Sequence, residues 1–147
     1  MTKITVRELR EEDIPELSRI EAASFSMPWS AAAFGELLTR SYCTYLTALA
    51  DGRVAGCCGY TDSFHEANID NVVVAPEYRN RGIAQIMLAK LLERGAASGV
   101  ESYVLEVRVS NLPAIHIYEK LGFRSVGIRP RFYEKPVEDA MIMKRER

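Results

Sequence analysis

Apolar residues recur along the 147-residue chain with two spacings, and segments of each kind follow one another from end to end. A spacing of two, as in 4–9, is typical of a half-buried strand, whereas the recurrence of Ile14, Leu17 and Ile20 is typical of an amphipathic helix. Strands are predicted at 4–9, 42–49, 54–60, 67–74, 103–109, 123–128 and 140–144, and helices after Asp13, Ser30, Gly82 and Asn111. The order β-α-α-β-β-β-α-β-α-β-β predicts one α/β domain with a mixed sheet over residues 1–147.

Turn and cap residues set the predicted boundaries of these elements. Asp51-Gly52 is a hairpin signal between two strands, and Ser30 can cap the short helix that follows it. Gly99 is a suitable end for the long helix. The polar stretch 61–66 is predicted to be a loop or a sheet edge.

Composition restricts the partners that we expect. The chain is 48% hydrophobic and 27% charged, with a formal net charge of −1. This balance gives no reason to expect direct contact with nucleic acid or a membrane surface. No apolar run approaches the ~20 residues of a membrane-spanning helix, and the first residues lack signal-peptide features. We therefore expect a cytoplasmic protein.

The three cysteines, Cys43, Cys57 and Cys58, have no metal-site spacing. There is no C-x-x-C pair and no histidine pair at ligand spacing, so no metal is expected. Cys57 and Cys58 are neighbours in a predicted strand and should point to opposite faces of the sheet. We interpret all three as small buried hydrophobic residues in a reducing compartment.

A short basic turn joins the strand that ends near Ala75 to the long helix. Strand, turn and helix in this order can present backbone N–H groups to a phosphate. Gly82 stands at the helix start, where a side chain would block close approach, and Arg79 and Arg81 can add charge-assisted hydrogen bonds. The turn has neither the G-x-G-x-x-G nor the P-loop pattern. On these features alone, a pyrophosphate site and an ordinary exposed basic turn are both open.

Three further residues have a structural and a functional interpretation. Glu106 lies in an otherwise apolar strand, on the face that carries Val104 and Arg108, so it either pairs with Arg108 or lines a cleft. Tyr118 lies on the apolar stripe of its helix and is a core residue or an active-site hydroxyl. Asn111 stands at a strand-to-helix junction, where it caps the helix or contacts a ligand.

Two motifs, in this order, resemble the GNAT N-acetyltransferases. Arg79, Gly82 and Ala84 fit the turn Arg/Gln-x-x-Gly-x-Gly/Ala, and 111–123 fits Asn-x-x-Ala-x-x-x-Tyr-x-x-x-Gly-Phe at every fixed position. The resemblance implies the GNAT fold: a mixed, mostly antiparallel sheet of about seven strands, flanked by about four helices and splayed at its central parallel strands. It also implies acetyl-CoA as co-substrate.

Further segments are similar to the RimI branch of that family, whose members acetylate the N-terminal alanine of a small-subunit ribosomal protein. These segments are Pro28-Trp29-Ser30 with Phe34, Leu105-Glu-Val-Arg108 with Ser110-Asn111, and Glu138-Asp139-Ala140 with Met143. The resemblance implies Glu106 as the base and Tyr118 as the acid. Two departures lie where the acceptor peptide would bind: Phe132-Tyr133 stands where two tyrosines are usual, and the stretch from Tyr133 to Glu138 is shorter.

The chemistry that this resemblance implies is direct attack on a thioester. A peptide α-amine has a pKa near ~8 and a lysine amine near ~10.4, so the α-amine is the easier nucleophile near neutral pH. A glutamate can accept its proton directly or through water, a tyrosine can protonate the leaving thiolate, and a strand N–H near 72–74 can polarise the carbonyl. No covalent enzyme intermediate is needed.

The expected site follows from these roles. Cofactor contacts are expected at Val72, Val73, Val74, Arg79, Asn80, Arg81, Gly82, Ile83, Ala84, Asn111 and Tyr118. Acceptor contacts are expected at Trp29, Glu66, Asn71, Arg108, Arg131, Tyr133 and Asp139. The acceptor is expected to be a protein N-terminus, and the oligomeric state is left open.

Two other functions remain open at this point. The first is acetylation of a polyamine, an aminoglycoside or protein lysines, for which Glu66, Asp70, Glu138 and Asp139 could supply an acidic pocket. The second is a non-catalytic acetyl-CoA-binding or interaction module, which the presence of Glu106 and Tyr118 disfavours.

Overall fold

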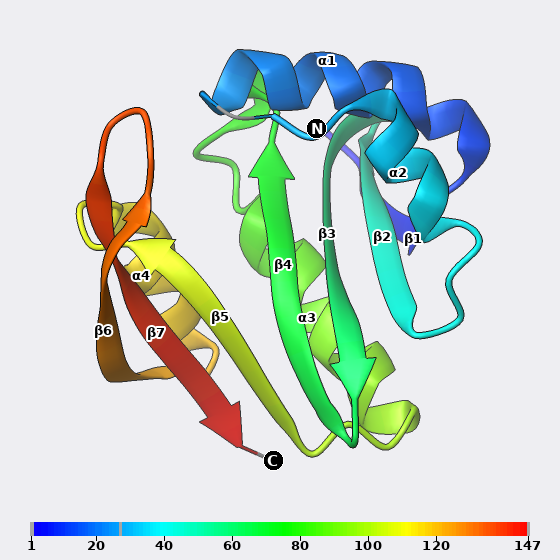
Figure 1. Ribbon diagram of the computed structural model, residues 1–147. Coiled ribbons are helices and arrows are strands. Elements are labelled where there is room, and N and C mark those ends of the chain that lie inside the picture. Colours follow the sequence, from blue (N-terminus) through cyan, green and yellow to red (C-terminus); the bar gives the residue numbers. More distant parts are fainter. Residues whose placement is uncertain (1, 27, 147) are drawn as a thin grey trace.

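One seven-stranded sheet, in the order β1-β2-β3-β4-β5-β7-β6, runs through the chain (Figure 1). The structure is a computed structural model that describes residues 2–26 and 28–146. Its strands are β1 (Ile4–Glu8), β2 (Cys43–Ala50), β3 (Arg53–Ser63), β4 (Glu66–Val74), β5 (Ser102–Arg108), β6 (Arg124–Tyr133) and β7 (Glu138–Glu146). Its helices are α1 (Ile14–Ser24), α2 (Ala31–Leu37), α3 (Ile83–Ala97) and α4 (Leu112–Lys120), with short 3-10 turns η1 (Glu11–Asp13) and η2 (Pro76–Tyr78). The predicted mixed sheet of about seven strands with four helices is confirmed.

The sheet opens between its two parallel strands. β4 and β5 pair only over Glu66–Asn68 and Ser102–Val104, whereas the other neighbouring strands are antiparallel and pair over longer stretches. Beyond these three pairs the two strands diverge, as Figure 1 shows. The predicted splay is therefore confirmed, and it leaves one edge of β4 from Asp70 to Val74 without a partner strand.

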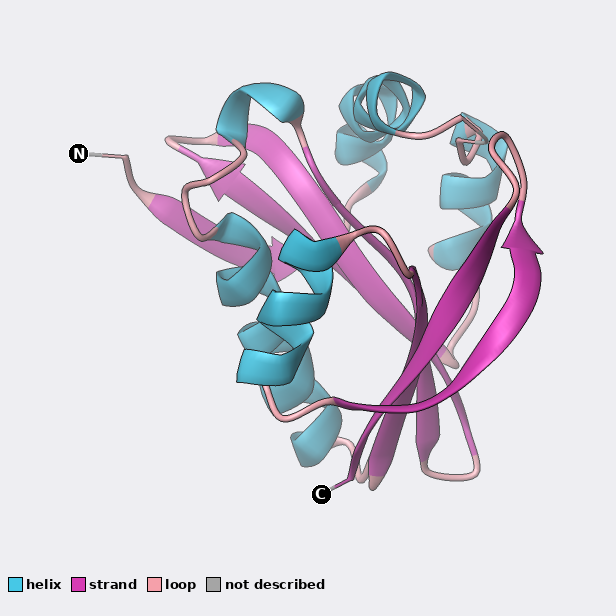
Figure 2. Cartoon of the chain, turned by 90° about the vertical axis from the view of Figure 1, so that its left-hand side faces the viewer, coloured by secondary structure: helices cyan, strands magenta, loops and turns pink. Residues whose placement is uncertain are grey.

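Helices cover both faces of the sheet (Figure 2). They bury two apolar clusters, one on each face. On one face α1 and α2 bury Leu17, Ile20 and Phe34, each with no exposed surface, and each such burial contributes roughly 1.5–3 kcal/mol. On the other face α3 and α4 pack over the second cluster. Cys57 belongs to the first cluster and Cys58 to the second, which confirms that they point to opposite faces.

The caps expected from the sequence are in place. Ser30 Oγ accepts a hydrogen bond from the Ala33 N–H at 3.1 Å, and Asn111 Oδ1 accepts one from the Ala114 N–H at 3.3 Å. Gly82 is the N-cap of α3 with φ +77°, a left-handed conformation that glycine adopts without a steric cost.

Several predicted boundaries differ in the structure. Of the stretch 61–66, predicted as a loop or a sheet edge, only Phe64 and His65 form a turn, because Asp62 and Ser63 extend β3 by pairing with Ala67 and Glu66. Likewise, β6 continues to Tyr133 and β7 begins at Glu138, beyond the predicted ends. In both places backbone pairing extends the strand although the side chains are polar or exposed, so no apolar alternation marked it.

Candidate active site

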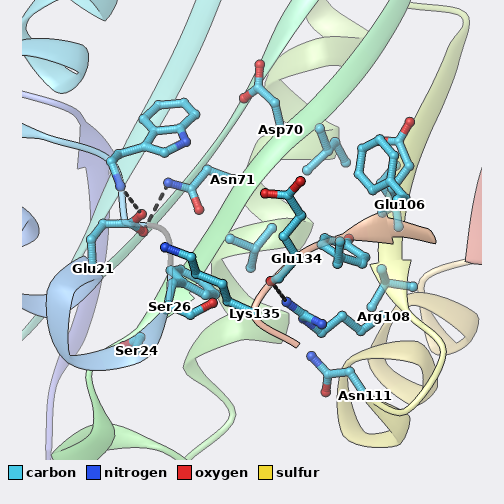
Figure 3. A pocket seen from close by; sticks show the side chains of 18 of the residues that line it. Glu21, Ser24, Ser26, Asp70, Asn71, Glu106, Arg108, Asn111, Glu134 and Lys135 are labelled. Atoms are coloured by element: carbon cyan, nitrogen blue, oxygen red, sulfur yellow. Dashed lines mark hydrogen bonds between the residues drawn. The ribbon is translucent and has the colours of Figure 1, made fainter. Parts of the chain in front are cut away.

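A cavity of about 790 Å³ lies in the splay between β4 and β5 (Figure 3). Its walls come from the end of α1 and the loop after it, the middle of β4, the second half of β5, the start and inner face of α4, and the β6–β7 connection. Eight of the predicted site residues line it: Trp29, Asn71, Val72, Glu106, Arg108, Asn111, Tyr118 and Tyr133.

Glu106 lines the cavity from β5, with 21% of its side chain exposed. Its nearest cationic group among the described residues is Arg129, at 4.0 Å from Oε1. Arg108, the partner that the structural interpretation required, pairs with Glu138 instead, at 3.2 Å. Of the two interpretations left open for Glu106, the structure therefore has the cleft-lining one and not the ion pair with Arg108.

Tyr118 is both a core residue and a cavity residue. It is 7% exposed, its ring packs against Phe123 at a centroid distance of 5.8 Å, and it lines the cavity from α4. Burial raises the pKa of the Tyr118 hydroxyl, and the nearby Cys58 and Tyr133 raise it further. The hydroxyl therefore stays protonated through the neutral range and can act as a hydrogen-bond or proton donor.

Arg108 holds the β6–β7 connection over one side of the cavity. Its guanidinium donates hydrogen bonds to the backbone oxygens of Pro136 and Glu134, each at 3.0 Å, besides its ion pair with Glu138. It also lies 4.5 Å from the Tyr133 ring centroid. Arg108 was predicted to contact the acceptor, and the structure instead directs its donors to this connection.

Glu138 completes that arrangement from β7. It accepts a hydrogen bond from the Ser110 N–H at 2.9 Å, and the bond with Ser110 followed by the contact with Arg108 lowers the pKa of Glu138. The β6–β7 connection is thus attached both to β5 and to the loop that begins α4.

The opposite wall contains a buried polar pair that the sequence analysis missed. Glu21, 1% exposed, accepts hydrogen bonds from the Trp29 backbone N–H and from Asn71 Nδ2, each at 3.1 Å. Burial raises the pKa of the Glu21 carboxyl, although both hydrogen bonds oppose this. A signal was present, because Glu21 lies seven residues after Ile14 on the buried stripe of α1, where a charge is unusual.

The basic turn lies at the N-terminus of α3. Among the described residues, nothing accepts from the backbone N–H groups of Ile83, Ala84 and Gln85, the first three of the helix. Asn80, with φ +63°, and Gly82 shape the turn so that this end stays open. Free N–H groups and the positive end of the helix dipole make it a suitable anion site.

Arg79 differs from its predicted role in this turn. Its Nε donates to the Val74 backbone oxygen at 3.2 Å, and its Nη2 donates to Ser24 Oγ at 3.0 Å. The guanidinium therefore attaches the turn to β4 and α1. Arg81 is exposed, with its guanidinium 5.7 Å from the Tyr78 ring centroid, and it has no ion pair among the described residues.

Three predicted acceptor residues lie outside the cavity lining. Glu66 stands at the start of β4, where it pairs with Lys144 at 3.6 Å. Arg131 and Asp139 lie side by side on the β6–β7 pair, where the Arg131 N–H donates to Asp139 Oδ1 at 3.0 Å. Asp70, by contrast, lines the cavity, and its carboxylate accepts hydrogen bonds from Tyr45 and Thr61.

Residues 2–26 and 28–146 contain neither a metal-binding cluster nor a membrane-spanning helix. No three His, Cys, Asp or Glu side chains are grouped so that they could hold a metal ion. No helix in these residues combines the length and apolar character needed to cross a membrane.

Comparison with known proteins agrees with this geometry. The sequence profile of the acetyltransferase (GNAT) family matches residues 14–123. The chain is 40% identical to the Bacillus subtilis "Putative [ribosomal protein bS18]-alanine N-acetyltransferase", over 97% of this chain and 95% of that one. It is 34% identical to the Salmonella typhimurium [ribosomal protein bS18]-alanine N-acetyltransferase, over 95% of both.

A solved structure matches the fold over almost the whole chain. The crystal structure of the Escherichia coli ribosomal-protein-S18-alanine N-acetyltransferase matches with a TM-score of 0.90 at 30% identity, over 98% of this chain and 94% of that one. The profile match spans most of the chain and includes the turn before α3 and helix α4 with Tyr118. From its sequence, its fold and its relatives, this chain belongs to the GNAT family of acetyltransferases.

Proposed function

We propose that the chain transfers the acetyl group of acetyl-CoA to the α-amine of a protein N-terminus, and that the acceptor is the N-terminal alanine of a small-subunit ribosomal protein. The observation that carries the proposal is the cavity in the splayed sheet, with Glu106 and Tyr118 in its walls and an open helix N-terminus nearby. The relatives named for alanine N-acetylation support the choice of acceptor.

The residues fit acetyl-CoA along one path. The free N–H groups at the start of α3 suit the pyrophosphate, with Arg81 close by to add charge. The edge of β4 from Asp70 to Val74 has no partner strand, so its peptide groups are available to the amide-bearing pantetheine arm and to the thioester carbonyl. Asn111 and Tyr118 line the cavity on the opposite side.

In this mechanism Glu106 accepts a proton from the acceptor amine, directly or through one water. The neutral amine then attacks the thioester carbon. Tyr118, whose pKa is raised by burial, keeps its proton in the neutral range and donates it to the departing thiolate. As the amide forms, its nitrogen loses a second proton, which returns to the Tyr118 oxygen. One C–N bond forms, one C–S bond breaks, and the two protons that the ammonium group loses are accounted for by Glu106 and by the thiol, with Tyr118 restored.

A competition between three acceptors tests this proposal. The protein is mixed with acetyl-CoA and an alanine-leading peptide, a lysine-containing peptide with a blocked N-terminus, or spermidine, and release of free thiol is followed. We expect turnover with the alanine-leading peptide to exceed that with the other two by at least tenfold. Faster turnover with either of the others would refute the assignment, and binding of acetyl-CoA without turnover of any would favour a non-catalytic role.

A small cationic amine remains the second candidate because of one observation. Asp70 and Glu134 line the cavity, and neither has an ion-pair partner among the described residues. Uncompensated carboxylates in a cavity attract cations. The spermidine arm of the competition decides between the two candidates.

A further inference from the structure

Asn71 and Glu21 form a hydrogen bond across the cavity wall that brings α1 and β4 together. The bond joins Asn71 Nδ2 to Glu21 Oε2 at 3.1 Å, the two residues are fifty positions apart, and both are buried. The other oxygen of Glu21 accepts from the backbone N–H of Trp29, in the loop that forms the rim of the cavity. Figure 3 shows both bonds as dashed lines that meet at the Glu21 carboxylate, with Asn71 beside it.

This bond decides which way the Asn71 amide points. An ionised carboxylate has only acceptors, so the amide must turn its NH₂ group to Glu21 and its oxygen away. That oxygen, Oδ1, has no hydrogen-bond partner among the described residues. An atom without a partner is either fully buried or accessible, and Oδ1 is not among the fully buried ones. Because Asn71 lines the cavity, Oδ1 faces the open space.

The backbone places Asn71 for such a role. Asn71 pairs with Gly59 and Ile69 pairs with Tyr60, so Asp70 has no counterpart on β3 and forms a bulge. Bulges redirect the side chains that follow them. Asn71 also directly precedes the segment 72–74, where a strand N–H is expected to polarise the thioester carbonyl.

We propose that Glu21 is a positioning residue that holds the Asn71 amide with its oxygen toward the acceptor, and that Asn71 Oδ1 accepts a hydrogen bond from the attacking amine. The inference rests on the proposed function in one respect, namely that a primary amine enters this cavity. After one proton has passed to Glu106, such an amine retains two N–H donors and one lone pair. An acceptor at Oδ1 fixes one N–H, and this limits the directions in which the lone pair can point.

The opposite amide orientation could not bind the amine in this way. With its NH₂ group toward the cavity, Asn71 would present N–H donors to the N–H donors of the amine, and no hydrogen bond could form between them. Because the carboxylate of Glu21 excludes this orientation, Glu21 acts on the acceptor through Asn71, without itself needing to touch the reacting atoms.

Glu21→Gln tests the orientation while nearly preserving shape. The new amide can accept from the Trp29 N–H with its oxygen, which leaves its NH₂ group facing Asn71. Asn71 must then turn its oxygen toward residue 21 and its NH₂ group toward the cavity. We expect kcat/KM for the acceptor to fall about 10- to 100-fold, as expected for one lost hydrogen bond to a buried group, with the Kd of acetyl-CoA unchanged.

The double variant Glu21→Gln with Asn71→Asp supplies the rescue. A carboxylate at position 71 can accept from the amide at position 21 and still present its second oxygen to the cavity. We expect kcat/KM for the acceptor to be at least tenfold higher in the double variant than in Glu21→Gln alone. A purely structural role for Glu21 predicts no such recovery.

Two controls separate orientation from folding. Trp29 is the only tryptophan, so its fluorescence emission reports directly on the rim loop and should be unchanged in both variants. Asp13→Asn makes the matching change at another buried carboxylate, in η1, and should lower stability without changing the acceptor KM.

Several results would overturn the inference. The first is that Glu21→Gln has the kinetics of the wild type. The second is that Glu21→Gln loses affinity for acetyl-CoA as much as it loses kcat/KM for the acceptor, with a shifted Trp29 emission. The third is that the double variant shows no recovery. The wild-type protein with the alanine-leading peptide reports on the proposed function alone. If that peptide is not turned over, the same variants are compared on whichever amine the wild type acetylates, so the two failures are distinguishable.

Discussion

Arg108 on β5, which lines the cavity, and Glu138 on β7 form an ion pair, with Arg108 Nη1 3.2 Å from Glu138 Oε1. The same guanidinium donates to the backbone oxygens of Glu134 and Pro136. One planar group with several donors therefore fixes a connection that would otherwise be held only at its two ends.

Arg108→Lys is expected to loosen this connection. A lysine ammonium keeps the charge but cannot reach all three partners at once, so the KM of the acceptor should rise about tenfold, in line with the loss of one or two charge-assisted hydrogen bonds. Steady-state kinetics with each substrate varied in turn will measure this. Arg124→Lys, at an exposed pair with Glu146, is the matched control. Equal effects on both substrates would show that Arg108 acts on the whole fold.

Glu106→Gln is expected to lower kcat about 10²- to 10⁴-fold, the range for a positioned general base. The amide is almost isosteric and cannot accept the proton, so the Kd of acetyl-CoA should stay within twofold. The remaining rate should rise with pH as solvent deprotonates more of the acceptor amine. Full activity of this variant at neutral pH would exclude Glu106 as the base.

Tyr118→Phe removes the hydroxyl and keeps the ring that packs on Phe123. We expect kcat to fall at least tenfold with little change in stability. Burial raises the pKa of Tyr118, so its donor form should persist well above neutral pH and wild-type kcat should not decline between pH 7 and 9. Tyr103→Phe is the control, since it removes a buried hydroxyl on β5 that donates to the Leu92 backbone oxygen on α3. A decline in both variants alike would indicate a packing effect.

Local signals in the sequence account for most of the fold. Caps such as Ser30, the hairpin at Asp51-Gly52 and the glycine at the start of α3 act within a few residues, so their structural effect follows from neighbouring positions alone. The splay between β4 and β5 was expected only from the resemblance to the GNAT family. The spacing of apolar residues along the chain gave no indication of it. The extended end of β3 was missed because backbone pairing formed it without an apolar face.

The partners of the charged residues could not be predicted from the sequence. Glu106 and Arg108 share a face of one strand, yet Arg108 reaches thirty residues along the chain to Glu138. Arg79 matches a phosphate-binding motif, yet its guanidinium lies against Val74 and Ser24. Such choices depend on which segments the fold brings together. A charge on a buried stripe, as at Glu21, indicates that a partner exists but not which one.

Acid sensitivity should depend on Asp13. Burial alone would raise its pKa, but hydrogen bonds from Arg7, the Arg10 N–H and Thr47 together lower it below the usual value. A lowered pKa in the folded state stabilises the protein above the unfolded pKa of ~3.9, and the contribution is lost as pH falls through the folded value. Asp13→Asn should therefore reduce the free energy of unfolding by about 3 kcal/mol at pH 7. Urea denaturation should show this difference closing below about pH 4, and a constant difference would contradict the assignment.

Gly82→Ala separates backbone strain from cofactor contact at the start of α3. Among the described residues, none other than its immediate neighbours along the chain comes within 4 Å of a Cβ built at Gly82, so the fold has room for a methyl group. The φ of +77° nevertheless costs an alanine about 1–2 kcal/mol. Gly52→Ala is a close match, with φ +82° and equally open space, in the hairpin between β2 and β3. Both variants should lose similar stability in thermal unfolding.

Only Gly82→Ala should weaken acetyl-CoA binding, because its methyl group would occupy the space through which a pyrophosphate approaches the N–H groups of Ile83 and Ala84. We expect a loss of at least tenfold in affinity by calorimetry, against less than twofold for Gly52→Ala. If the two variants bind acetyl-CoA equally well, the open end of α3 is not the phosphate site, and the unpartnered edge of β4 would have to account for most of the affinity.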